Sequence, residues 1–354
     1  MALIVTVIVL LLALALLSAG MFVFVFVRRP VPSYDTPEAL DASRWRDYRD
    51  PLYRGICWLR DRNPETVTVE SFDGLRLSGR FIPRDHARGA LILLHGYRSS
   101  PEIDVTAGLS QYYAMGLSLL ICDQRAHGAS EGRLITMGIK ERYDAVAWAE
   151  YLARRLGRET PIYFGGISMG ATTALMASDL PMEANLRGVI ADCGFTSPGD
   201  IVRYLMKRHY RLPPRPLAAL LNLSCRLFGG FGLDQWSTVR SMERVRVPVL
   251  FFHGEADRFV PQEMTEAAYV ACVSPKRLLT FPGADPENFN CLFCYCPLYA
   301  LGDQCGGAFR YTDQGRKDCT RCTFPHRREN YGKVNARYED IAKLAAKNRG
   351  NGEP

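Results

Sequence analysis

An uninterrupted apolar segment opens the chain. Residues 1–27 carry no charged side chain and consist mainly of Leu, Val, Ala, Ile and Phe. A helix needs about 20 apolar residues to cross the hydrocarbon core of a bilayer, so the segment predicts a transmembrane anchor. A cleavable signal peptide is the alternative, with Ser18, Ala19 and Gly20 as its cleavage site. No basic side chain precedes the run, and the run continues past Gly20, which favours the anchor.

Short apolar runs and helical patterns alternate through the middle of the chain. A hairpin pattern comes first, with alternating runs at residues 66–72 and 75–82 on either side of a turn at Asp73 and Gly74. Buried-strand patterns follow at residues 90–94, 117–122, 162–165, 188–191, 247–252 and 277–281. The clearest helical pattern between them is the amphipathic run at residues 140–156. Buried strands that alternate with helices predict a mostly parallel α/β sheet, which binds ligands at the carboxyl ends of its strands.

The alternation stops between residues 194 and 246. Apolar residues recur there at helical spacing, and prolines stand at positions 213, 214 and 216. We predict helices joined by a Pro-rich turn, inserted as a cap over residues 195–246. The complete α/β domain is expected to span residues 66–285. The stretch that joins it to the anchor, residues 28–65, is juxtamembrane and has helical potential.

Charge and cysteine content restrict the location and the partners. The net charge of +7 is mild and no basic stripe is interleaved with aromatic residues, so nucleic acid is not expected as a partner. Arg28 and Arg29 follow the apolar segment and no basic side chain precedes it, which predicts a single-pass membrane protein with a cytoplasmic body. Six of the 11 cysteines crowd into residues 291–322. In a reducing compartment, this crowding favours a metal site over disulfides.

The motif with the clearest chemistry is Gly166-Ile167-Ser168-Met169-Gly170. It has the G-x-S-x-G form, follows a strand pattern and precedes an Ala-rich helical pattern, which is the context of a nucleophile elbow. The turn from strand to helix is tight, so the residues that flank the serine must be small. The pattern predicts Ser168 as a nucleophile, and an ordinary glycine turn is the alternative.

Two further parts of a serine hydrolase have candidates. The backbone N–H groups of Met169 and of Tyr97, in the loop after the first parallel strand, are expected to form the oxyanion hole. His95 of the same loop is expected to brace it rather than to transfer a proton. Asp257, which follows the next-to-last strand, is expected to orient the catalytic base, with Glu255 as the nearby alternative.

These motifs resemble the α/β-hydrolase superfamily, in particular its membrane-anchored bacterial serine hydrolases related to the serine aminopeptidase and lipase-like branch. The resemblance covers roughly residues 65–285 and rests on four motifs in order. They are residues 95–96, 123–130, 166–170 and 253–261. The resemblance implies the α/β-hydrolase fold with a helical cap and a small-molecule or peptide substrate. It implies only a scaffolding role for the loop at residues 123–130.

The resemblance also implies a catalytic histidine in a turn after the last strand. Here residues 281–286 read Phe-Pro-Gly-Ala-Asp-Pro, and no histidine follows the strand directly. Losing one member of a catalytic triad costs several orders of magnitude in rate. Three alternatives remain: His326 serves as a substitute base, His127 or His209 does so, or the serine site is inactive. The abrupt change in composition also fits a fusion or a deletion at this junction.

The last part of the chain has the spacing of a metal module. Two C-x-x-C pairs bracket two further cysteines, and a histidine follows the second pair. Tight turns that carry paired thiolates can complete a tetrahedral site. The candidate ligands are Cys291, Cys294, Cys296, Cys305, Cys319, Cys322 and His326. Zinc is the expected metal and an iron–sulfur cluster the alternative, while a disulfide scaffold is less favoured.

Residues 288–345 resemble the cysteine-rich small domain, a zinc-binding module of bacteria and archaea. If His326 binds metal, it cannot also serve Ser168. The sequence therefore leaves two functions in competition. One is a membrane-anchored serine hydrolase that acts on an ester, thioester or peptide bond, with activity impaired by the missing histidine. The other is a non-catalytic hydrolase-like scaffold with a zinc module that binds a ligand or a partner.

Overall fold

The computed structural model describes residues 1–281 except residue 44, residues 297–311 and 317–319, and residues 322, 324, 330, 333, 334, 336, 337 and 340. The predicted turn at residues 282–286, Cys291, Cys294, Cys296 and His326 lie outside the described residues.

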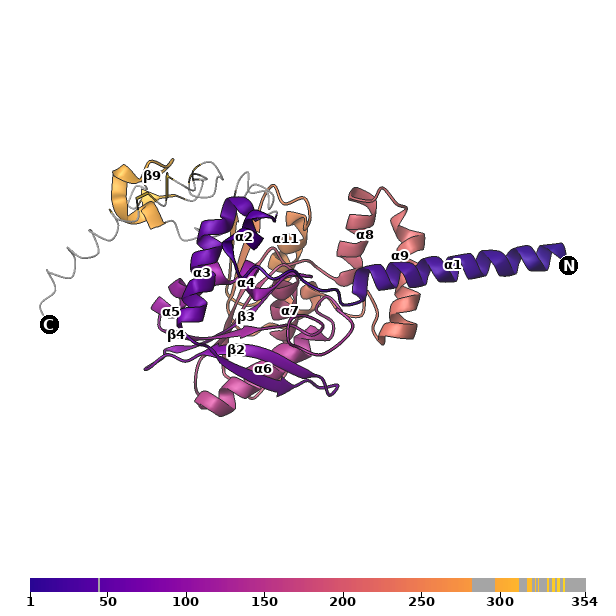
Figure 1. The fold of residues 1–354 in the computed structure, drawn as a ribbon, viewed down its shortest axis with the longest axis horizontal. Coiled ribbons are helices and arrows are strands. Elements are labelled where there is room, and N and C mark those ends of the chain that lie inside the picture. The colour runs from indigo at the N-terminus through magenta and orange to yellow at the C-terminus, as the bar shows by residue number, and fades with distance from the viewer. Residues whose placement is uncertain are drawn as a thin grey trace, which may run out of the picture.

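An eight-stranded sheet forms the centre of the molecule (Figure 1). Its strands are β1 (Glu65–Glu70), β2 (Arg76–Ile82), β3 (Gly89–Leu94), β4 (Leu117–Cys122), β5 (Ile162–Ile167), β6 (Leu186–Asp192), β7 (Val249–Gly254) and β8 (Lys276–Phe281). The spatial order is β1-β2-β4-β3-β5-β6-β7-β8. Strand β2 pairs antiparallel with β1 and β4, and all the other pairs are parallel. The sheet and the strand patterns predicted from the sequence are thus confirmed, with strand ends that differ by at most two residues.

The described α-helices are α1 (Ala2–Phe26), α2 (Pro37–Asp41), α3 (Arg49–Asp61), α4 (Pro101–Asp104), α5 (Thr106–Ala114), α6 (Glu141–Leu156), α7 (Met169–Ala177), α8 (Pro198–Arg208), α9 (Pro214–Ser224), α10 (Thr238–Met242) and α11 (Gln262–Ala271). Helices α3 and α5 cover one face of the sheet, and α6 and α7 cover the other. The described part of the chain also contains the short helical turns η1 (Arg46–Tyr48), η2 (Cys225–Gly229), which is π-helical, and η4 (Pro297–Cys305). A two-stranded sheet of β9 (Arg310–Tyr311) and β10 (Lys317–Asp318) follows η4.

The burial of β3 shows how the two layers form. Ala90, Ile92 and Leu94 belong to the apolar cluster under α6 and α7, and Leu91 and Leu93 belong to the cluster under α3 and α5. Successive side chains of a strand point to opposite faces. A continuous apolar run is therefore what a strand buried on both faces requires.

The stretch between the first helix and the sheet belongs to the body of the fold. Helix α3 packs against α5, and its Leu59 joins the cluster on that face of the sheet. Helix α2 packs on α3 through Leu40, which is fully buried with Ile56. The sequence predicted helical potential over residues 28–65, and the structure adds that these helices complete one covering layer.

The segment between β6 and β7 contains the predicted helices. Helices α8 and α9 are joined through Pro213 and Pro214, and the latter occupies the first position of α9, where its missing N–H leaves no bond unmade. Met206, Leu221 and Phe231 pack in one cluster with Met169, beside the serine. We call residues 198–233 the cap.

The first helix does not stand apart from this cap. Helix α1 extends away from the body and passes α8 and α9 at its C-terminal end (Figure 1). Phe22 and Phe26 are buried in the same cluster as the cap residues. Among the described residues, α1 is the one helix long and apolar enough to cross a membrane.

Candidate active site

Ser168 occupies a sharp turn between β5 and α7. Its φ and ψ are 54° and −113°, a region that a side-chain-bearing residue seldom adopts. A Cβ at Gly166 would overlap the backbone of Gly170, and a Cβ at Gly170 would overlap the carbonyl of Leu94. The two glycines of the motif are therefore required by the close approach of three backbone segments. Such strain is held in place at functional sites by the surrounding structure.

The sequence analysis expected the backbone N–H groups of Met169 and Tyr97 to form an oxyanion hole. Met169 is the first residue of α7, and the first N–H groups of a helix have no partner within the helix. Tyr97 stands in the loop after β3. Within the described part of the chain, neither N–H donates to another backbone carbonyl or to a side chain. The pair is thus available to a developing negative charge.

Asp104, in α4, holds the loop that carries Tyr97. The N–H of Gly96 donates to Oδ2 of Asp104 at 2.6 Å, and the hydroxyl of Ser99 donates to Oδ1 at 2.7 Å. The carboxylate therefore fixes the loop on both sides of Tyr97. The sequence analysis missed this residue. Its only signal was an acidic side chain in a short Pro-initiated helical turn after the loop.

His95 braces the same loop, as the sequence predicted. The N–H of Gln124 donates to Nε2 at 3.1 Å, so Nδ1 carries the proton and donates to the carbonyl of Gly96 at 2.8 Å. Complete burial lowers the pKa of His95 to about 3, with a smaller contribution from His127. His95 is therefore neutral, and neither of its nitrogens is available for proton transfer.

Asp257 follows β7 and is held by its own turn. Its Oδ1 accepts hydrogen bonds from the N–H groups of Phe259 and Val260 at 2.8 and 2.9 Å, and its side chain is only 4% exposed. Glu255, the alternative, is exposed and accepts a bond from the hydroxyl of Thr280 in β8. Of the two acids, Asp257 is therefore the one whose carboxylate is buried and held in a fixed orientation.

Two other histidines are also fully engaged. His253 contacts Oγ1 of Thr265 through Nδ1 at 2.7 Å and the carbonyl of Val260 through Nε2 at 2.9 Å. His127 accepts the N–H of Arg98 at Nε2 (3.1 Å), and its Nδ1 lies 2.9 Å from the carbonyl of Arg125. Burial lowers the pKa of both rings. His127, one of the substitute bases considered from the sequence, is therefore a structural residue in this fold.

Two described histidines have exposed rings. His86 lies in the turn before β3, at the opposite end of that strand from the Tyr97 loop. His209 ends α8, and its ring packs edge-on against Phe259, two residues after Asp257, at 5.8 Å between centroids. Of these two, His209 is the one on the side of the acid loop.

Cys193 lies next to the serine turn but is not a second nucleophile. The N–H of Ser168 donates to the carbonyl of Asp192, the residue before it. Burial raises the pKa of the Cys193 thiol, and the charges of Asp192 and Asp257 add to this effect. The thiolate is the reactive form of cysteine, so this thiol is inert at neutral pH.

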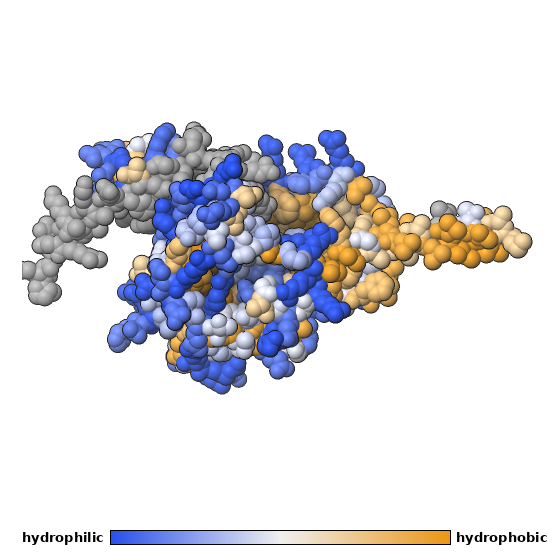
Figure 2. Space-filling model, viewed as in Figure 1, coloured by the Kyte–Doolittle hydropathy of each residue, from blue (hydrophilic) through white to orange (hydrophobic). Residues whose placement is uncertain are grey.

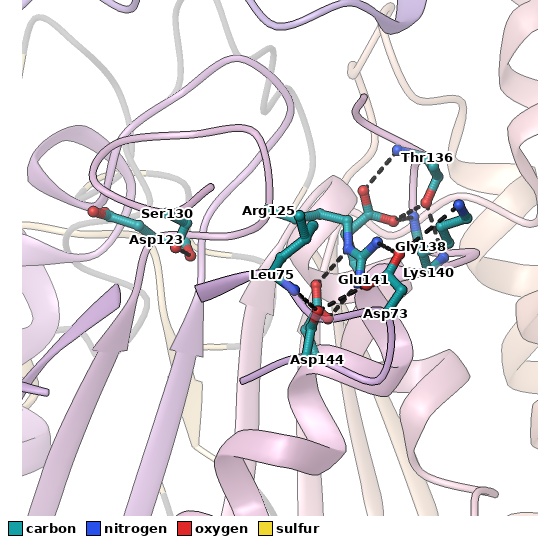
Figure 3. A network of polar contacts seen from close by, with 11 residues as sticks. Asp73, Leu75, Asp123, Arg125, Ser130, Thr136, Gly138, Lys140, Glu141 and Asp144 are labelled. Atoms are coloured by element: carbon teal, nitrogen blue, oxygen red, sulfur yellow. Dashed lines mark hydrogen bonds and ion pairs between the residues drawn. The ribbon is translucent and has the colours of Figure 1, made fainter. Parts of the chain in front are cut away.

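A polar network stabilises the loop at residues 123–130 (Figure 3). Arg125 is 2% exposed and forms a bidentate pair with Asp144, with both N–O distances 2.6 Å, and a second pair with Asp73 at 3.0 Å. Burial lowers the pKa of Arg125, but its hydrogen bonds and ion pairs with Asp144 and Asp73 together outweigh this effect, and the pKa is raised. At the other end of the loop, Ser130 donates to the carbonyl of Asp123 at 2.6 Å. The network supports the loop that carries His127, which agrees with a scaffolding role.

The structure describes three of the seven predicted metal ligands. The N–H of Gly307 donates to Sγ of Cys305 at 3.4 Å, and Cys319 and Cys322 form a tight turn closed by a 2.9 Å backbone bond. A Cβ at Gly307 would lie 3.8 Å from Sγ of Cys305 and 2.7 Å from Sγ of Cys322. The two sulfurs therefore flank one glycine, and N–H donation to sulfur suits a metal thiolate.

This arrangement fits part of a thiolate site. Among the described residues, no three His, Cys, Asp or Glu side chains come together in a group that could hold a metal ion. The other four predicted ligands lie outside the described residues.

The chain matches the sequence models of two known protein families. Residues 91–290 match the sequence model of the alpha/beta hydrolase family, and residues 270–349 match that of the cysteine-rich small domain. The chain is 27% identical over 210 residues to YqkD of Bacillus subtilis. The aligned region covers 59% of this chain and 68% of YqkD. It is 26% identical over 226 residues to the alpha/beta hydrolase domain-containing protein WAV2 of Arabidopsis thaliana. The aligned region covers 61% of this chain and 69% of WAV2.

A solved esterase from Pyrococcus furiosus has the same fold. It superposes with a TM-score of 0.54 over 73% of this chain and 90% of its own, at 24% sequence identity. The family match spans more than half of the chain, from β3 to the end of the sheet, and includes Ser168 and Asp257. The chain belongs to the alpha/beta hydrolase family.

Proposed function

We propose that the chain is a membrane-anchored serine hydrolase that cleaves an ester, thioester or peptide bond. The observation that carries the proposal is the backbone of Ser168, held at φ 54° between glycines that no larger residue can replace. In an ordinary glycine turn, the serine would not need to adopt this strained backbone conformation. The neighbouring unbonded N–H groups of Tyr97 and Met169 add the second requirement of acyl transfer.

The proposed reaction divides into two steps. The Oγ of Ser168 attacks the substrate carbonyl carbon, a base takes the hydroxyl proton, and the oxyanion accepts hydrogen bonds from Tyr97 and Met169. The leaving group departs with the proton, and water then hydrolyses the acyl-serine ester. Asp257 orients the base and stabilises its protonated form.

The base in this proposal is a histidine other than the three that are held within the fold. His95, His127 and His253 have both ring nitrogens bonded, and His86 lies at the far end of β3, which leaves His209 and His326. His209 has in its favour the contact of its ring with Phe259, in the turn that holds Asp257. His326 has in its favour its position in the module that follows β8, although a metal would compete for it.

The cysteine-rich module has a structural role in this proposal. Thiolates of Cys305, Cys319 and Cys322 would hold zinc together with ligands from the rest of the module, and an iron–sulfur cluster is the alternative. Bound metal contributes folding free energy to so small a domain. No catalytic step passes through it.

A non-catalytic scaffold is the second candidate function. The observation in its favour is the engagement of three histidines, since a serine without a base reacts slowly at neutral pH. On this alternative the site around Ser168 binds a ligand or a protein partner without cleaving it.

Fluorophosphonate labelling of the full chain in detergent separates the two. We expect labelling that Ser168→Ala abolishes and that Ser110→Ala, on α5 away from the site, leaves unchanged. Loss in His209→Ala but not in His326→Ala would identify His209 as the base, and the reverse result would identify His326. A folded, metal-loaded chain that takes no label would leave the scaffold function.

A further inference from the structure

The last turns of α1 are packed against the cap. Every residue between positions 2 and 17 whose side chain is described is exposed, and Ser18 is the first buried one. Its hydroxyl lies 2.8 Å from the carbonyl of Leu220 and 2.5 Å from the hydroxyl of Ser224, both in α9. Helices α1 and α9 therefore lie side by side over the final turns of α1.

The apolar run of α1 sets the depth of the cap. The run continues past Ser18 to residue 27 without a charged side chain, and a spanning helix keeps such a run in the hydrocarbon core of the bilayer. A membrane that α1 crosses therefore has the level of Ser18 in or beside its hydrocarbon core. Helix α9 lies at this level, so it cannot remain wholly in water.

The surface of the cap next to α1 is apolar. Phe228 contacts Phe22 at 6.2 Å between ring centroids, and Tyr210 contacts Phe24 at 6.4 Å. Phe228 and Leu227 remain 66% and 68% exposed in spite of these neighbours. Figure 2 shows a hydrophobic surface that continues from α1 onto the adjoining part of the body. Exposed apolar area of this kind marks a membrane or protein interface.

The charge of the cap is mostly positive. Residues 198–233 contain six Arg or Lys side chains and one acid, Asp200, which pairs with Arg203 at 2.8 Å. The exposed ones are Lys207, Arg208, Arg211, Arg215 and Arg226. Arg226 directly precedes the exposed Leu227, and Arg211 directly precedes the exposed Leu212. Basic residues beside an apolar surface are typical of segments that lie on anionic lipids.

We propose that the cap is itself a membrane-docking surface. The apolar side chains of α9 and the η2 turn enter the leaflet next to α1, and the surrounding basic side chains bind anionic lipid headgroups. The proposal rests on the membrane anchoring proposed above. It adds that the cap over Ser168 is held at the bilayer surface and does not move free of it on a flexible linker.

Site-specific photocrosslinking to lipid tests the proposal on the full chain in nanodiscs. p-Benzoylphenylalanine is placed at Leu227 of the cap, at Val273 as the matched control, and at Leu12 of α1. Leu227 and Val273 are 68% and 69% exposed, but Val273 lies between α11 and the start of β8, at the amino end of the parallel strands, whereas the cap packs at their carboxyl ends beside Met169. We expect lipid adducts from Leu227 and Leu12 and none above background from Val273.

The outcomes separate the docking from the anchor. Adducts from Leu12 alone would overturn the docking proposal and keep the anchor. Absence of adducts from all three positions would overturn the anchoring and the docking with it. Adducts of Leu227 with a second protein chain in place of lipid would identify the surface as an interface between copies, which also contradicts the proposal.

Lipid charge provides the second readout. Replacing part of the phosphatidylcholine with phosphatidylglycerol should increase the adduct yield at Leu227. The double variant Arg211→Gln, Arg215→Gln should lose this increase, because its positive charge near the surface is lower. An increase of equal size in the variant would remove the role assigned to the basic side chains.

Discussion

The hydroxyl of Tyr97 donates a hydrogen bond to the backbone carbonyl of Val25, in the last turn of α1. Burial raises the pKa of Tyr97 to about 12, so the phenol keeps its proton at neutral pH. Arg98 adds bonds to the carbonyls of Phe24 and Val27 at 2.5 and 3.2 Å. The last carbonyls of a helix lack partners within it, and here the proposed oxyanion loop supplies them. The first helix and the loop that carries Tyr97 are thus one structural unit.

Removing the hydroxyl of Tyr97 should weaken this unit. We expect Tyr97→Phe to lower the free energy of unfolding by about 0.5–1.5 kcal/mol, the net value of a hydrogen bond, and to slow fluorophosphonate labelling. Thermal unfolding of the full chain in detergent measures the first effect. Tyr113→Phe is the control, since its hydroxyl makes only an exposed 3.4 Å contact with the carbonyl of Pro83. Equal melting temperatures for the two variants would contradict the coupling.

Asp104 should control the shape of the oxyanion loop. In Asp104→Asn one oxygen becomes an N–H₂ group, which cannot accept from both Gly96 and Ser99. We expect a loss of about 1–3 kcal/mol in stability or in labelling rate, because a buried donor is left without a partner. Labelling rates and hydrogen exchange over residues 96–99 report the change. Asp85→Asn, in an exposed turn, should behave like wild type, and a silent Asp104→Asn would rule out the positioning role.

The serine turn should not tolerate any side chain at Gly170. Gly170→Ala forces a Cβ into the carbonyl of Leu94, so we expect a cost of about 2–4 kcal/mol and loss of labelling. Gly20→Ala is the matched change, because nothing lies within 4 Å of a Cβ there. Denaturant unfolding compares the two variants. A stable Gly170→Ala chain would mean that the backbone segments are farther apart than described.

Buried neutral His95 predicts acid sensitivity. The pKa of His95 is about 3 in the folded state and 6.5 without burial. Between these two pH values the unfolded chain is protonated at His95 and the folded chain is not. The contribution of His95 is therefore complete above pH 6.5 and is lost as the pH falls toward 3. Since carboxylates also titrate in this range, the test compares variants by denaturant unfolding from about pH 7.5 down to about pH 4.5.

We expect His95→Asn to be less stable than wild type at neutral pH and to lose less stability on acidification, because the amide cannot be protonated. His86→Asn replaces an exposed turn histidine and should follow the wild-type pH curve. Parallel curves for wild type and His95→Asn would show that His95 is not the source of the acid sensitivity.

Metal content should depend on the thiols next to Gly307. We expect the purified chain to contain zinc, and Cys305→Ala and Cys322→Ala each to lower the zinc content measured by elemental analysis. Chelation should destabilise the module, since bound metal contributes to its folding. Cys272→Ala lies in the hydrolase core and should keep the metal. Wild-type metal content in both module variants would refute the assigned ligands.

The sequence was sufficient for what depends on local pattern. Strand positions followed from apolar runs, and the serine turn followed from small residues at fixed spacing around Ser168. Asp257 could also be preferred as the candidate acid, because it follows a strand whose carboxyl end was expected to lie at the site. In each case the signal and the structure that it specifies lie within about ten residues of each other.

What the sequence could not show are contacts that no periodicity or motif records, most of them between distant segments. Asp104 is close in sequence to Gly96 and Ser99, but nothing in the pattern shows that the loop folds back onto this acid. The engagement of His127 with Arg98 requires two loops to meet, and no periodicity records that meeting. The docking of α1 was hidden for the same reason, since a helix apolar on all sides gives no indication of which side it buries.

The contact between Ser18 and α9 also determines when α1 can complete its packing during synthesis of the chain. Ser18 is separated by 202 positions from Leu220, whose carbonyl its hydroxyl contacts. The first helix leaves the ribosome long before its partner exists, and chains fold from the N-terminus as they are made. Its final packing therefore waits until more than half of the chain has been translated. On the proposed anchoring, the hydrolase is assembled onto a helix already in the bilayer, which makes the membrane the template for the last stage of folding.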